Sequence, residues 1–119
     1  MQLGDFKQAF MKINNKVNME VFGQGLVSQR LEIFNDKVLV IGHNKRAKVI
    51  STIERKDSIT SKLIDIALIV EYKELFIKYM QEELGVKVLT HLKDYDGDSE
   101  LSFSVTFLEK PVEELLKEL

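Results

Sequence analysis

The chain has 119 residues, of which 45% are hydrophobic and 30% charged, with a formal net charge of −2 and no cysteine. These values are typical of a globular protein, and the length suits a single domain over residues 1–119. The near-neutral charge provides no global field that would select nucleic acid or an anionic membrane. The lack of cysteine excludes disulfides, thiolate metal sites and a cysteine nucleophile, and it fits a cytoplasmic protein.

The first part of the chain predicts a helix followed by a β-hairpin. Apolar residues at alternating spacings of three and four predict an amphipathic helix over residues 3–21, which ends at two glycines. Apolar and polar residues alternate over 26–34, and residues 38–41 form an apolar run, so both segments are expected to be strands. The short Asn35-Asp36 turn between them favours an antiparallel hairpin.

A long helix is predicted for residues 58–84, which contain no proline or glycine. Asp57 can cap its start and Gly85 can end it. At about 1.5 Å per residue, the helix is about 40 Å long, as long as a domain of this size. The apolar run inside it is far shorter than the roughly 20 residues that span a bilayer.

The first half of this long helix is apolar nearly all round, because Asp65 is the only polar residue from 63 to 70. Such a helix must be covered on more than one side. We therefore expect either a kink or a second copy of the chain, and we favour a homodimer. Asp65 would then face solvent or pair with a lysine across the interface. The expected interface residues are Leu63, Ile66, Leu68, Ile69 and Val70.

The segment 45–56 is the most basic part of the chain. Its apolar residues have helical spacing but are β-branched, and we predict a short helix. A solvated face is the favoured interpretation, and a phosphate or nucleic-acid patch is the alternative. No aromatic residue is interleaved for base stacking, so nucleic acid is the less favoured partner. The cations of this candidate patch are Lys45, Arg46, Lys48, Arg55 and Lys56.

The last part of the chain predicts a second hairpin and a short helix. Strands are expected at 86–93 and 100–108, joined by a loop over 94–98, and Pro111 starts the final helix. The strand at 100–108 alternates most clearly. Its four large apolar residues are expected to point into the core and its three hydroxyl residues to point outward. These are Leu101, Phe103, Val105 and Phe107, and Ser102, Ser104 and Thr106.

The order of elements predicts an α+β fold with two layers. Two β-hairpins would form a four-stranded antiparallel sheet, with the long central helix and further helices on one face. The other face is expected to be small, polar and open to water. Its residues would be Ser28, Arg30, Glu32, Ser102, Ser104 and Thr106.

Candidate metal sites are weak. Asp94, Asp96 and Asp98 have the spacing that opens a calcium loop, but the glycine and glutamate that should follow are misplaced. A hairpin turn is therefore favoured over a cation site. The two histidines, His43 and His91, lie in no metal-ligand spacing and are interpreted as turn or surface residues.

Candidate catalytic residues are equally few. An enzyme centred on Arg30 and His91, on the polar sheet face, is a third hypothesis, but nothing there has the form of a triad or dyad. The pair Gly23 and Gly25 is too short for a dinucleotide fingerprint and follows a helix. We expect no catalytic residue, no cofactor and no metal.

Three runs carry a family resemblance: FGQGLVSQRLEIFNDKVLVIGHNKR, EELGVKV and THLKDYDGDSELSFSVTFLE. Over roughly residues 10–110 the chain resembles the Na-translocating system MpsC-like (YbcI-like) family of small bacterial proteins, long filed as a domain of unknown function. The matching positions are Gly23, Gly25, Arg30, Asp94 and Asp98. Leu26 stands where the family usually has proline, and the segment 45–56 matches poorly.

The resemblance implies association with a membrane-embedded cation or bicarbonate uptake system. It carries over no catalytic residue. We therefore hypothesise a non-enzymatic, homodimeric, cytoplasmic accessory or regulatory domain that binds a protein partner. The alternative is a small nucleic-acid- or phosphate-binding protein that uses the basic segment 45–56.

Overall fold

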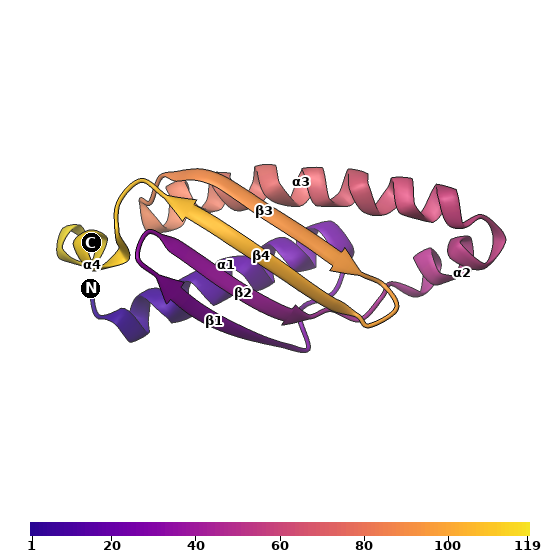
Figure 1. The fold of residues 1–119 in the computed structure, drawn as a ribbon, viewed down its shortest axis with the longest axis horizontal. Coiled ribbons are helices and arrows are strands. Elements are labelled where there is room, and N and C mark those ends of the chain that lie inside the picture. Colours follow the sequence, from indigo (N-terminus) through magenta and orange to yellow (C-terminus); the bar gives the residue numbers. More distant parts are fainter.

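The computed structural model describes residues 1–119 and confirms the predicted α+β fold (Figure 1). Four helices accompany one four-stranded antiparallel sheet with strand order β1-β2-β4-β3. The two long helices lie on one face of the sheet, the two short helices lie beyond its ends, and the order of elements is the predicted one. The elements are α1 (Leu3–Phe22), β1 (Ser28–Phe34), β2 (Lys37–His43), α2 (Lys48–Lys56), α3 (Ser58–Leu84), β3 (Val88–Asp96), β4 (Leu101–Leu108) and α4 (Val112–Glu118).

The core lies between the sheet and the helices α1 and α3. The predicted stripe of α1 supplies Phe6, Phe10, Ile13 and Val17, and all four are buried. The second half of α3 supplies a second set, and the central strand β2 supplies a third. These are Tyr72, Phe76, Met80 and Leu84, and Val38 and Val40. The ring of Phe10 meets the ring of Phe76 edge-on, with centroids 5.2 Å apart, which ties α1 to α3.

The predicted orientation of β4 is wrong. Ser102, Ser104 and Thr106 are buried beneath the helices, whereas Leu101 and Phe103 are 49% and 46% exposed on the open face of the sheet. Alternation reveals that a strand has two faces, but it does not say which face the helices cover. The expected small, polar outer face is therefore apolar at its centre.

Two contacts explain why the hydroxyl face is the covered one. The Ser102 hydroxyl donates to Asn44 Oδ1 at 2.6 Å. Thr106 Oγ1 lies 2.8 Å from His91 Nδ1. The buried hydroxyls of Ser102 and Thr106 therefore each have a polar partner, which removes most of the cost of burying them.

The long helix α3 runs without interruption from Ser58 to Leu84, so it is not divided into two shorter helices. Asp57 accepts hydrogen bonds from the backbone N–H groups of Ile59 and Thr60, and Gly85 ends the helix in a left-handed conformation, both as predicted. Figure 1 shows that the first half of α3 extends beyond the sheet and runs beside α2. The molecule is elongated as a result, with extents of 51 × 22 × 21 Å.

Most strand boundaries, and those of α1 and α2, differ from the prediction by one to three residues. The helix predicted within 45–56 is confirmed and begins at Lys48. Strand β3 continues to Asp96, so Asp94 and Asp96 belong to a strand and not to a loop. The β3–β4 turn is short, and its backbone includes Glu100 with a φ of 59°. None of the helices combines the length and apolar composition that a membrane crossing requires.

Candidate functional site

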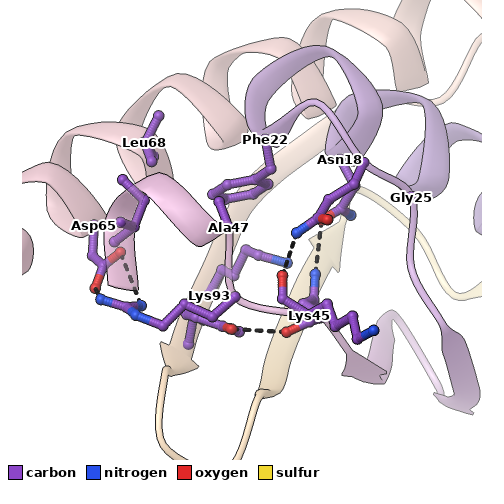
Figure 2. Close-up of a pocket in the computed structure, with 13 residues that line it drawn as sticks. Asn18, Phe22, Gly25, Lys45, Ala47, Asp65, Leu68 and Lys93 are labelled. Carbon is purple, nitrogen blue, oxygen red and sulfur yellow. Dashed lines mark hydrogen bonds and ion pairs between the residues drawn. The ribbon is translucent and has the colours of Figure 1, made fainter. Parts of the chain in front are cut away.

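A small cavity of about 30 Å³ lies where α1, α2 and α3 meet the end of the sheet (Figure 2). Its walls come from four parts of the chain that are far apart in the sequence. Figure 2 shows Asp65 of α3 on one side of it and Asn18 of α1 on the other. The lining residues are Asn18, Phe22, Gln24, Gly25, Asn44, Lys45, Arg46, Ala47, Ile50, Asp65, Leu68, Lys93 and Tyr95.

Asparagines organise the polar wall of this cavity. Asn44 Nδ2 donates to Asn18 Oδ1 at 2.8 Å, and Asn18 Nδ2 donates to the backbone oxygen of Asn14 at 2.9 Å. The Tyr95 hydroxyl donates to the backbone oxygen of Asn44 at 2.7 Å. Buried and mutually bonded amides hold one geometry, because any rearrangement would leave a polar group unpaired. This wall is therefore pre-formed.

Lys93 enters the cavity from β3. Its ammonium group lies 4.1 Å from the centroid of the Tyr72 ring, a cation–π contact. It forms no ion pair with any carboxylate, and burial lowers the pKa of Lys93 to about 8. A largely buried ammonium with an aromatic ring as its main partner is uncommon, because burying a charge is costly unless it is paired.

Arg46 forms the other side of the cavity and is fully engaged within the chain. Its Nε lies 3.1 Å from Glu54 Oε2 and its Nη2 lies 3.2 Å from Asp65 Oδ2. Its side chain is only 8% exposed. Asp65 therefore neither faces solvent freely nor needs a lysine from a second copy, because its partner is an arginine of the same chain. This pairing ties the β2–α2 connection to α3.

The candidate basic patch is therefore divided by the fold. Arg46 is buried and neutralised, whereas the other four cations are exposed on α2 and the segment before it. These four are Lys45, Lys48, Arg55 and Lys56.

His91 is a core residue, so its interpretation as a turn or surface histidine is wrong. It is 3% exposed, and its ring stacks on Phe76 with centroids 4.3 Å apart. Burial lowers the pKa of His91 to about 3, with smaller effects of Lys93 and Lys73 in the same direction. The residue was misassigned because a polar side chain in an edge strand usually faces water.

The proposed catalytic pairing of Arg30 with His91 is excluded by the sheet. Arg30 is exposed on β1, where its Nε pairs with Glu32 Oε1 at 3.1 Å. His91 points to the helices from β3, at the opposite edge of the sheet. His43 ends β2 and is half-buried. No group of three or more His, Cys, Asp or Glu side chains is placed to hold a metal ion.

The positions behind the family resemblance have structural roles. Gly23 ends α1 with a φ of 77°. Gly25 passes so close to Asn15 that an added Cβ would lie 2.7 Å from Asn15 Oδ1. Asp94 accepts a hydrogen bond from the backbone of Tyr95, and Asp98 is exposed in the β3–β4 turn.

The expected dimer residues divide into two groups. Leu63, Ile66 and Val70 are 61%, 59% and 51% exposed. Leu68 and Ile69 are half-buried, and Leu68 lines the cavity. Ile59, at 71% exposure, lies in the same outward row at a spacing of four and was not among the expected interface residues, although it shares their helical spacing.

A second apolar surface covers the open face of the sheet, and sequence reasoning missed it because it turned β4 the wrong way. The register places Ile41 beside Phe103, and Val105 between Leu39 and Leu92. These side chains therefore form one continuous patch. Charged residues of both signs surround it on the edge strands, namely Arg30, Glu32 and Asp94.

Comparisons of this chain with protein-family models, with curated proteins and with solved structures found no match.

Proposed function

We propose that this chain is a non-enzymatic accessory or regulatory domain that forms a homodimer and binds a protein partner. One observation carries the proposal: two surfaces of the chain, the outward row of α3 and the open face of the sheet, each expose several large apolar side chains next to one another. Large contiguous apolar patches are rare on proteins that work alone, and they mark interaction sites.

The row on α3 suits a second copy of the chain. Ile59, Leu63, Ile66 and Val70 follow spacings of four, three and four, the spacing of a helix seam that packs against another helix. The first half of α3 extends beyond the sheet (Figure 1), so a partner helix can approach the start of this row away from the strands. Two identical rows in a two-fold arrangement bury each other and leave no open end.

The open sheet face suits a different protein. An apolar centre with a charged rim is the usual composition of such a binding surface. Its rim carries both signs, which favours a partner of mixed charge over a membrane surface or a nucleic acid. The family resemblance suggests a membrane-embedded cation or bicarbonate uptake system as the class of partner, with this chain on the cytoplasmic side.

The test of the dimer is the mass of the protein in solution. We expect the wild type to sediment as a dimer and the variant Leu63→Glu/Ile66→Glu to sediment as a folded monomer, because both substitutions place a charge at a seam of the apolar row. Lys78→Glu, an exposed change farther along the same helix, is the matched control and should remain dimeric. A wild-type protein that stays monomeric at high concentration would refute the dimer.

A nucleic-acid- or phosphate-binding protein is the second candidate, and the exposure of Lys45, Lys48, Arg55 and Lys56 favours it. The test is binding of a short single-stranded oligonucleotide at rising salt. If the candidate is right, affinity falls steeply with salt and the variant Lys48→Gln/Arg55→Gln shows a shallower dependence. An absence of binding at low salt would eliminate it. Arg46 should be left intact, because its loss would disturb the fold.

A further inference from the structure

The ammonium group of Lys93, in the lining of the cavity, has no carboxylate partner within the protein. The Lys93 ammonium faces the ring of Tyr72, 4.1 Å from its centroid, and donates to no protein oxygen. The carboxylates nearby are already bonded. Asp65 and Glu54 pair with the Arg46 side chain, and Glu100 Oε2 accepts from the Arg46 backbone N–H at 2.6 Å. The amides of Asn18 and Asn44 are bonded to each other.

The shape and lining of the cavity restrict what can join this ammonium. At about 30 Å³ it accommodates a compact group, since one water needs about 10–15 Å³ on this measure. Phe22, Ile50 and Leu68 supply the apolar part of its lining. Lys45, the other lining cation without an ion pair, is exposed to solvent, so the enclosed charge to be balanced is that of Lys93, and a monoanion fits better than a phosphate dianion.

We propose that this cavity binds a short-chain carboxylate, with the carboxylate group on the Lys93 ammonium and the alkyl part against Phe22, Ile50 and Leu68. The ammonium supplies three donors to the two oxygens of the ligand. The lowered pKa of Lys93 fits an ammonium that lacks its anion, because an anion in contact with it would raise that pKa. The proposal is independent of the dimer and of the protein partner.

The test uses sodium acetate as the probe and sodium chloride at equal ionic strength as the reference. We expect acetate to raise the thermal midpoint of the wild type in a saturable way, beyond the effect of chloride. In Lys93→Met the apparent dissociation constant for acetate should rise by at least about tenfold, because one charged hydrogen bond is lost. Lys87→Met, at an exposed lysine just before β3, should respond as the wild type does.

Three results would overturn the proposal: an equal response to chloride, an equal response of Lys93→Met, or a larger response to sodium phosphate than to acetate. A measurement on the wild type alone covers the case in which Lys93→Met does not fold. The side-chain amide resonances of Asn18 and Asn44, which line the cavity, should shift saturably with acetate in NMR spectra. Those of Asn35, in the β1–β2 turn at the other end of the hairpin, should not. Equal shifts at all three asparagines, or none, would refute the site.

Discussion

At the scale of single residues, His91 couples the stability of the fold to pH. The ring is neutral in the core, since burial holds its pKa near 3, against 6.5 for the exposed side chain. Below pH 6.5 the unfolded chain therefore binds a proton that the folded chain does not, and stability falls as pH falls. Between pH 7 and pH 5 we expect a loss of about 2 kcal/mol in the free energy of unfolding.

Urea unfolding at the two pH values measures this loss, and His91→Phe is the informative variant. Phenylalanine keeps the stacking on Phe76 and removes the titrating group, so the loss between pH 7 and pH 5 should shrink by most of that amount. An unchanged loss in the variant would show that other groups are responsible.

Arg46 illustrates a cation whose role is structural. Its replacement by glutamine leaves Asp65, whose side chain is 24% exposed, without its partner. We expect Arg46→Gln to cost on the order of 2 kcal/mol of stability, because a largely buried ion pair loses one member. Asp65→Asn should cost less, since Arg46 retains Glu54. A double-mutant cycle measured by urea unfolding checks the coupling, and additive effects of the two changes would contradict it.

At the scale of elements, a glycine-to-alanine substitution is expected to change stability in opposite directions at the end of α3 and at the start of α1. Gly85 ends α3 with a φ of 68°, a conformation that side chains disfavour, so Gly85→Ala should cost about 1 kcal/mol. Gly4 lies in the first turn of α1 with open space around it, so Gly4→Ala should stabilise the protein by about 0.5 kcal/mol. Thermal unfolding of both variants distinguishes the two effects, and destabilisation by both would contradict the assignment at Gly4.

At the scale of the whole molecule, the two apolar surfaces should act independently, because they lie on different elements. Phe103→Lys places a charge at the centre of the open sheet face, where Phe103 is 46% exposed. We expect this variant to remain folded and dimeric, to bind less of a dye that fluoresces on apolar surfaces, and to lose the protein partner. Met19→Lys, at an apolar residue of α1 with a similar exposure of 49%, is the matched control for the added charge. A monomeric Phe103→Lys would assign the dimer to the sheet instead of to α3.

The sequence by itself determined the elements and their order. Local signals were sufficient for the two long helices. The spacing of Phe6, Phe10, Ile13 and Val17 predicted α1, and the capping residues Asp57 and Gly85 predicted the ends of α3. The hairpins followed from alternation and short connections. These features depend on interactions within a few residues along the chain, which a sequence displays directly.

The tertiary structure alone decided which faces are covered and which polar groups meet. A shift of β4 by one residue would place Phe103 instead of Ser104 beneath the helices. The hydroxyl face is covered because its hydroxyl groups find partners there, such as His91 and Asn44. Likewise, Arg46 and Asp65 are 19 residues apart, and Lys93 meets Tyr72 from another layer. Such pairings are set by packing between distant segments, so no local pattern could indicate them.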